Sequence, residues 1–130
     1  MRNGLEHVAE DREQRWDELI TEAITGPPGL FNPNGWVVTA FQAALSAIVN
    51  TPEPAEQPSD HFRDALIAAV RIGDDTDTVA AIAGALLGAR WGTVAIPDEW
   101  NTAIHGDRQR GSEPVTATEL GRLARKAAST

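Results

Sequence analysis

One stretch of fifteen residues, WVVTAFQAALSAIVN (residues 36–50), is apolar almost all round and lies between two proline-rich segments. The segment before it, TGPPGLFNPNG (25–35), holds three prolines and three glycines, and the segment after it, TPEPAEQPS (51–59), holds three prolines. Such clusters mark loops, whereas about 14 residues without a turn signal favour a helix over a strand. A helix without a polar face is normally buried. We therefore predict a central helix bounded by two loops.

Further helices are predicted from helical spacing of apolar residues or from helix-start signals. Ser59 is the expected N-cap of one helix, Pro97 the first residue of another, and Thr116 with Glu119 forms a capping-box pattern for the last. The predicted ranges are about 6–24, 60–71, 79–90 and 97–105, with a final helix after Thr116. We therefore predict an all-α fold, a compact bundle of about six helices in a single domain covering residues 1–130.

Composition excludes several classes of function. Asp and Glu (19) outnumber Lys and Arg (11), for a net charge of -8, so a broad nucleic-acid-binding surface is not expected. Cysteine is absent, which excludes disulfides and thiolate metal sites. The longest apolar run, Val79 to Ala89, has about 11 residues, short of the roughly 20 that span a bilayer, and the charged N-terminus does not resemble a signal peptide. We expect a cytoplasmic protein without a membrane segment.

The stretch Asp75-Thr76-Asp77-Thr78 places two carboxylates and two hydroxyls directly before an apolar helix. Gly73 allows a sharp turn into it. Asp75 and Asp77 can point their carboxylates at one position if the turn is not yet helical, and Thr78 adds a hydroxyl. Hard oxygen ligands suit Mg²⁺, Mn²⁺ or Ca²⁺. The alternative is an acidic N-cap that stabilises the helix by about 1 kcal/mol, and spacing alone leaves both readings open.

Two known motifs compete for the same residues. An EF-hand loop counted from Asp75 would need Gly and Glu where Ala80 and Leu86 stand, so this motif fails. DTDTV also fits the opening motif of haloacid-dehalogenase-like phosphotransferases, which follows a β-strand. Here the preceding DALIAAVRIG is helical in period, and this reading is kept as a weaker alternative.

The run ALIAAVRIGDDTDTVAAIAGALLGARWGTVAIPDEW (65–100) closely resembles the C-terminal signature of the ADP-ribosylglycohydrolase family. That signature joins an alanine-rich helix, a Gly-Gly-Asp-Thr-Asp-Thr turn, an Ala/Gly helix and an Ile-Pro followed by an aromatic residue. Upstream, NGWVVTAFQAAL (34–45) is similar to the family's Gly-Tyr-Val helix. The resemblance covers about residues 30–106.

The resemblance implies an all-α hydrolase that removes ADP-ribose from modified proteins or from related ADP-ribose-type small molecules, using a pair of Mg²⁺ or Mn²⁺ ions. It implies that Asp75, Asp77 and Thr78 are metal ligands, while Thr76 receives no ligand role. Asp74 stands where the family usually has a second glycine, which adds charge beside the metals. The implied chemistry is metal-assisted attack of water on the anomeric carbon of the distal ribose.

The family's N-terminal metal-binding half, with its Thr-Asp-Asp cluster, has no counterpart in the sequence. Glu10 and Asp11 are adjacent acids, but Ala9 precedes them and Arg12 follows. We therefore expect the C-terminal part of an enzyme, holding half of the ligands of a dinuclear site, with the acid/base residue unidentified. The isolated chain is expected to be inactive, and to form a homodimer or bind a complementary chain. The alternative is a non-catalytic interaction or scaffold domain that keeps the fold.

Aromatic and histidine residues are weaker candidates. Trp36 matches the aromatic residue after the family's glycine and is a candidate for substrate binding, although packing in the core is the simpler reading. Trp91 is expected to pack near the end of the apolar helix. Three histidines are separated in sequence and are expected to be ordinary surface or capping residues: His7, His61 and His105.

Overall fold

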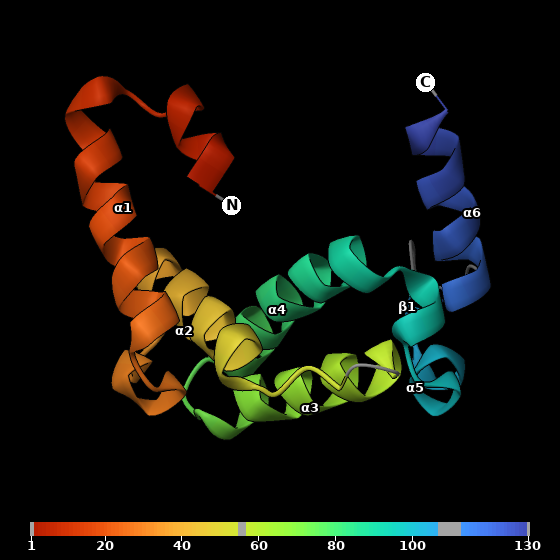
Figure 1. Ribbon diagram of the computed structural model, residues 1–130. Coiled ribbons are helices and arrows are strands. Elements are labelled where there is room, and N and C mark those ends of the chain that lie inside the picture. Colours follow the sequence, from red (N-terminus) through yellow and green to blue (C-terminus); the bar gives the residue numbers. More distant parts are fainter. Residues whose placement is uncertain (1, 55–56, 107–112, 130) are drawn as a thin grey trace. The chain divides into compact units, whose positions relative to one another are not determined.

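A computed structural model of the chain describes residues 2–54, 57–106 and 113–129, and its described part is almost entirely helical (Figure 1). The predicted all-α class and the number of α-helices, six among the described residues, are confirmed. The chain divides into two compact units, residues 1–95 and 96–130. No helix in the described part combines the length and the apolar character needed to cross a membrane.

The first unit holds four α-helices and three short 3₁₀ helices. In chain order these are η1 (Arg2–His7), α1 (Glu10–Thr25), η2 (Pro28–Phe31), α2 (Val37–Asn50), α3 (Pro58–Arg71), α4 (Thr76–Trp91) and η3 (Thr93–Ala95).

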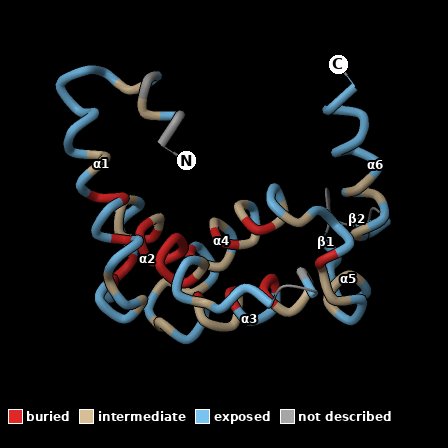
Figure 2. The backbone as a smooth tube through the Cα atoms, in the orientation of Figure 1, coloured by how far each residue is buried: buried red, intermediate tan, exposed pale blue. Residues whose placement is uncertain are grey.

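Helix α2 is the centre of this unit, as the sequence predicts. It packs against α1, α3, α4 and η2, and the buried positions in Figure 2 concentrate on it and on the helix faces that contact it. Ala40, Ala43, Ala44 and Ala47 are almost completely buried. Small side chains let neighbouring helices approach closely, so several helices can pack against one alanine-rich helix.

Helices α3 and α4 form a helical hairpin that packs along α2. Helix α4 buries one stripe, Val79, Ala83 and Leu87, which are spaced four residues apart and therefore share a helix face. Its outer face exposes Ala81 and Ala85. The apolar helix expected here is therefore buried on only one face, and the exposed alanines favour the helix through their intrinsic propensity.

His61 is buried in this unit, and the prediction of a surface or capping histidine is wrong for it. Its side chain is 0% exposed. The indole N–H of Trp91 donates to Nδ1 of His61 (3.0 Å), so Nδ1 is the acceptor and Nε2 donates to the carbonyl of Ile48 (3.2 Å). The two rings meet edge to face. Trp91 is thus a packing residue, as expected, and His61 joins α3 to α2 and α4.

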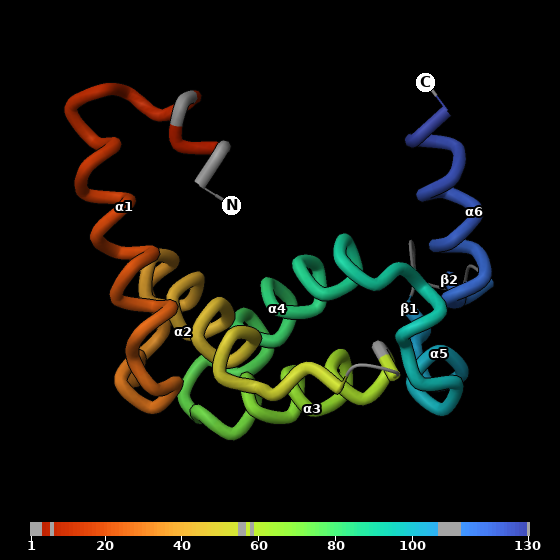
Figure 3. The backbone as a smooth tube through the Cα atoms, viewed as in Figure 1, coloured from red at the N-terminus to blue at the C-terminus, as the bar shows by residue number. Residues whose placement is uncertain are grey.

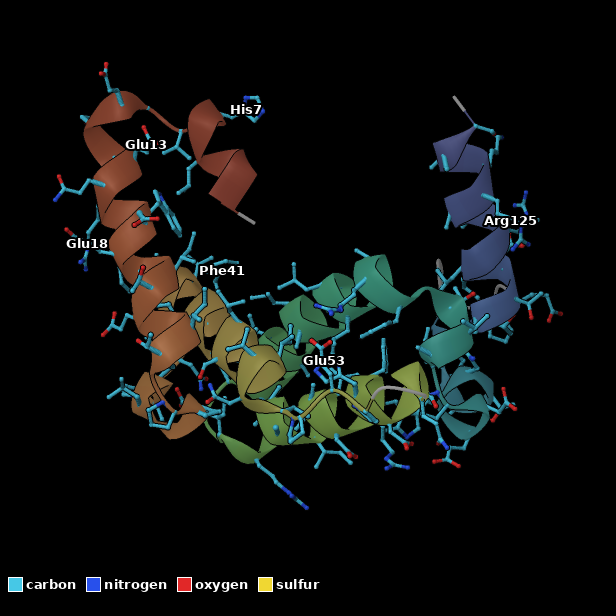
Figure 4. The ribbon with its side chains drawn as sticks, viewed as in Figure 1. His7, Glu13, Glu18, Phe41, Glu53 and Arg125 are labelled. Carbon is cyan, nitrogen blue, oxygen red and sulfur yellow. The ribbon has the colours of Figure 1, made fainter. Side chains whose placement is uncertain are left out.

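An ion pair crosses from the connector after α2 to the end of α4. Arg90 lies over the ring of Trp91, 4.6 Å from its centroid, and its Nη2 is 2.7 Å from Oε2 of Glu53 (labelled in Figure 4). Both charged groups are about half exposed, so this ion pair contributes little to stability.

Three helix starts differ from the predictions by one to three residues. Helix α3 begins at Pro58 after Gln57, so Ser59 is not its N-cap. Helix α4 begins already at Thr76. Pro97 precedes α5 (Asp98–Ala103) as its N-cap instead of forming its first residue. Local sequence signals place helix ends only approximately.

The second unit contains α5 (Asp98–Ala103), β1 (His105–Gly106), β2 (Val115–Thr116) and α6 (Ala117–Ala128). The two-residue strands pair antiparallel, His105 with Thr116 and Gly106 with Val115, whereas the sequence analysis placed residue 105 at the end of a helix and predicted no strand. Thr116 is the N-cap of α6, as predicted, but its side chain makes no capping hydrogen bond.

Glu119 of α6 instead accepts two hydrogen bonds from Arg122, at 2.9 and 2.8 Å. These bonds and the nearby negative charge raise the pKa of the exposed Arg122 guanidinium above its ordinary value.

Candidate functional site

The four oxygen-bearing residues lie at the turn that joins α3 to α4. After the end of α3, Gly73 and Asp74 both adopt positive φ angles of 86° and 62°. Glycine reaches this left-handed region without strain, and aspartate is one of the few other residues that visit it. Two consecutive left-handed residues reverse the chain, and α4 starts at Thr76 with Asp75 as its N-cap residue.

Asp75, Asp77 and Thr78 sit on both sides of this helix start. Asp75 precedes the helix and is half-buried, whereas Asp77 and Thr78 belong to its first turn and are exposed. The open turn through Thr78 that the sequence analysis considered is not formed. Successive helical residues point about 100° apart, so the side chains of Asp77 and Thr78 leave the helix in different directions.

The interpretation of the acidic cluster as a helix N-cap is correct for the position of Asp75 but not for its hydrogen bonding. Asp75 occupies the N-cap position, yet its side chain makes no capping hydrogen bond. The carboxylate that a cap would use is therefore not engaged by the first amides of α4, although it lies near the positive end of the helix.

The backbone of the turn is held by Asn34, a residue that the sequence analysis did not single out. Asn34 is 0% exposed. Its Nδ2 donates to the carbonyl of Gly73 (3.1 Å), and its Oδ1 accepts from the amide of Asp75 (2.9 Å). Asn32 adds a hydrogen bond from its Nδ2 to the carbonyl of Ile72 (2.8 Å). In Figure 3 the orange segment that includes η2 accordingly lies beside the green turn.

Asp74 faces this same loop. Its Oδ2 accepts a hydrogen bond from the backbone amide of Asn34 (2.8 Å). The sequence analysis placed the charge of Asp74 beside the proposed metals, but the carboxylate is engaged with the loop before α2. The residue that replaces glycine thus keeps the left-handed backbone and adds a contact that glycine cannot make.

The donor set of the turn suits a hard divalent cation but supplies few ligands. Asp75, Asp77 and Thr78 offer carboxylate and hydroxyl oxygens, the ligands that Mg²⁺ and Mn²⁺ prefer. Within residues 2–54, 57–106 and 113–129, however, no group of three or more His, Cys, Asp or Glu side chains is gathered in a way that could hold a metal ion. The donor oxygens of the turn are of the kind that these cations prefer, and metal binding by the turn stays a prediction.

Trp36 is the N-cap residue of α2, two positions after Asn34. Its side chain is 65% exposed, and Val37 beside it is 69% exposed. The reading that Trp36 packs in the core is therefore wrong. An exposed indole next to the loop that holds the turn is available to stack on a planar ligand.

A second acidic region lies on the N-terminal half of α1. An open groove of about 510 Å³ is lined by four acids together with Leu5 and Gln14, and Figure 4 labels two of these acids, Glu13 and Glu18, on α1. The acids that line it are Glu10, Glu13, Asp17 and Glu18. The neighbouring Glu10 and Asp11 project from the first turn of a solvated helix.

The reading as a haloacid-dehalogenase-like phosphotransferase is wrong. That motif needs a β-strand immediately before Asp75, and residues 58–71 form α3 instead.

Comparisons with known proteins give one consistent result. The family model described as ADP-ribosylglycohydrolase matches residues 1–129, a longer region than the sequence resemblance covered. The chain is similar to ADP-ribosylarginine hydrolase Tri1 of Pseudomonas putida (strain GB-1), with 42% identity over 52% of this chain and 16% of that protein. It is also similar to Tri1 of Serratia proteamaculans (strain 568), with 39% identity over 74% of this chain and 21% of that protein.

A third relative is human ADP-ribosylhydrolase ARH3, with 29% identity over 88% of this chain and 32% of that protein. The matched region spans between 16% and 32% of the length of these three relatives. No solved structure matches the chain.

Proposed function

Because this chain belongs to the ADP-ribosylglycohydrolase family, we propose that it contributes to hydrolysis of the N- or O-glycosidic bond of ADP-ribosylated substrates. The observation that carries this proposal is the turn after α3, where two carboxylates and a hydroxyl flank the start of α4. The backbone of this turn is fixed by a buried asparagine, and Asp75 is not used to cap the helix.

Asp75, Asp77 and Thr78 would hold Mg²⁺ or Mn²⁺ on one side of a dinuclear site. When bound, such a metal pair lowers the pKa of a coordinated water and orients the oxygens around the reacting carbon. The residues of this chain contribute by binding: they supply negative charge at the positive end of α4, where a cation would otherwise be disfavoured. Trp36 would add a stacking surface for the substrate, which we take to be an ADP-ribosylated protein or an ADP-ribose-type small molecule.

The remaining ligands and the acid/base residue would come from a partner, either a second copy of the chain or a complementary chain. Supporting this, the described residues gather no group of three or more His, Cys, Asp or Glu side chains that could hold a metal ion. Leu30, Trp36 and Val37, which lie just before or at the start of α2, are 57%, 65% and 69% exposed, and exposed apolar groups of this kind favour association. Light scattering that gave a stable monomer at high micromolar concentration would contradict this association.

The test is release of free ADP-ribose from an ADP-ribosylated protein, with Mg²⁺ and then with EDTA. We expect negligible turnover by the 130-residue chain alone. Adding a chain that carries the N-terminal metal-binding motif should restore turnover that EDTA abolishes. The double substitution Asp75→Ala, Asp77→Ala should lower the restored rate by at least about a hundredfold.

The matched control is the double substitution Asp60→Ala, Asp64→Ala, which removes the same charge from α3, where both acids pair with Arg63. The rate restored with this control should lie within about twofold of the rate restored with the parent chain, because exposed ion pairs contribute little to stability. Robust EDTA-sensitive release by the chain alone would contradict the need for a partner.

A second candidate function is a non-catalytic interaction or scaffold domain of the same family. The described residues gather no group of three or more His, Cys, Asp or Glu side chains that could hold a metal ion, which favours this candidate. The two candidates differ in two results: a scaffold would give no turnover with any complementary chain, and it would show no loss of partner binding in the Asp75→Ala, Asp77→Ala variant.

A further inference from the structure

We propose that Asn34 is a positioning residue for the turn between α3 and α4, acting through the backbone of Gly73 and Asp75. Asp74 in return accepts a hydrogen bond from the backbone of Asn34 and is not a metal ligand. The inference rests on the proposed function, since it assumes that Asp75 and Asp77 bind a divalent cation. It adds to that function a residue about 40 positions away in the sequence, outside the Asp-Thr-Asp-Thr motif.

The hydrogen bonds of Asn34 are all directed at one short stretch of backbone and side chain. The side-chain amide spans the turn, donating to the carbonyl of Gly73 and accepting from the amide of Asp75. The backbone amide of Asn34 donates to Asp74. Only an amide side chain carries a donor and an acceptor side by side, so Asp could not donate to Gly73 and Ser could not reach both groups.

The carboxylate of Asp75 makes no capping hydrogen bond and is available to bind a cation. The first amides of a helix need acceptors, and a nearby side chain commonly provides one. Here the acceptor for the amide of Asp75 is Oδ1 of Asn34, from the loop before α2. Asp75 makes no side-chain cap of its own, so its carboxylate is not engaged by the amides of the first turn while Asn34 holds its backbone amide.

Asp74 is excluded from the ligand set by the same contacts. Its Oδ2 lies 2.8 Å from the amide nitrogen of Asn34, and its backbone has a φ of 62°. Metal binding through the same Oδ2 would compete with this hydrogen bond to the loop that carries Trp36.

The experiment measures Mn²⁺ binding to the full chain by electron paramagnetic resonance, with amide hydrogen exchange on the same samples. Asn34→Ala should weaken Mn²⁺ binding by about ten- to a hundredfold, the usual effect of removing a group that orients metal ligands. It should also speed exchange at the amide of Asp75. The matched control is Asn50→Ala, which removes hydrogen bonds to Gly26 and Ser46 at the other end of α2 and should leave Mn²⁺ affinity unchanged.

Circular dichroism at the working temperature checks that both variants are folded. If Asn34→Ala fails to fold, Asn32→Ala replaces it, because Asn32 is exposed and bonds only the adjacent carbonyl of Ile72. This variant should weaken Mn²⁺ binding severalfold. Equal affinity in the parent, the Asn34 or Asn32 variant and the Asn50 control would overturn the inference while leaving the proposed metal site intact.

If the parent chain binds no Mn²⁺, the metal part of the proposed function fails, and amide exchange decides the remaining part of the inference. Exchange at Asp75 that is faster in the Asn34 variant than in the Asn50 control would support the positioning role. Equal exchange in the two variants would overturn it.

Discussion

The chain has two acidic regions of similar composition, and they differ in how their backbone is held. On α1, the acids at positions 10, 11, 13, 17 and 18 project from a regular helix whose N-terminal half has no buried residue. At the α3–α4 turn, Asp74, Asp75 and Asp77 lie on a backbone with two left-handed residues, fixed from another segment by a fully buried asparagine.

A similar density of acidic residues thus occurs on a backbone fixed from another segment and on a regular exposed helix. The α1 acids line an open groove, yet they project from an exposed helix face, where ion pairs contribute little to stability. The turn uses a conformation that needs glycine and a buried polar contact, both of which carry a free-energy cost. The turn therefore holds the groups on it at defined positions.

The largest effect on stability is expected for the asparagine that holds the turn. Asn34→Ala leaves the amide of Asp75 and the carbonyl of Gly73 without partners, which should lower the free energy of unfolding by about 2 to 4 kcal/mol. The counterpart on α1 is Gln14→Ala, which removes a 3.2 Å exposed hydrogen bond to Glu18 and should change it by less than about 0.5 kcal/mol. Urea unfolding followed by circular dichroism measures both, and equal effects would remove the contrast between the two regions.

A smaller effect is expected from the left-handed glycine itself. Gly73→Ala places a Cβ on a residue with a φ of 86° and should cost about 1 to 2 kcal/mol. Gly29→Ala is the control, since Gly29 has no atom within 4 Å of an added Cβ and no positive φ. Thermal unfolding should show a lower midpoint for the first variant and little change for the second. A neutral Gly73→Ala would mean that the turn is not conformationally demanding.

The smallest effect is expected on the charged face of α1. Arg15→Ala removes an ion pair with Glu18 at 3.4 Å, in which the two side chains are 67% and 53% exposed, and should change the free energy of unfolding by less than about 0.5 kcal/mol. Raising the salt concentration should reduce even this difference. A loss above 1 kcal/mol would show that the α1 acids belong to an organised network.

The helices could be predicted from the sequence because their signals are local. Proline-rich segments bound α2, and periodic apolar residues mark α1 and α3, so the all-α class follows from spacing and turn chemistry. The site residues Asp75, Asp77 and Thr78 were found from a dense local motif. Their metal binding remains a prediction.

The contacts that hold the site could not be predicted in this way. Asn34 meets the turn across 39 to 41 positions, and no local pattern indicates which asparagine in a loop is buried. The same reason explains His61, whose burial depends on Trp91 lying 30 positions away. The exposure of Trp36 depends on which segments cover the start of α2, which a single apolar pattern does not specify.

The most direct test of the difference between the two acidic regions is a Mn²⁺ titration of charge-matched variants by electron paramagnetic resonance. We expect the parent chain to bind weakly and saturably, because the turn supplies only part of a coordination sphere. Asp75→Asn with Asp77→Asn should abolish that binding, while Glu10→Gln with Glu13→Gln on α1 should leave it within about twofold. Loss of binding in the α1 variant with retention in the turn variant would contradict the account.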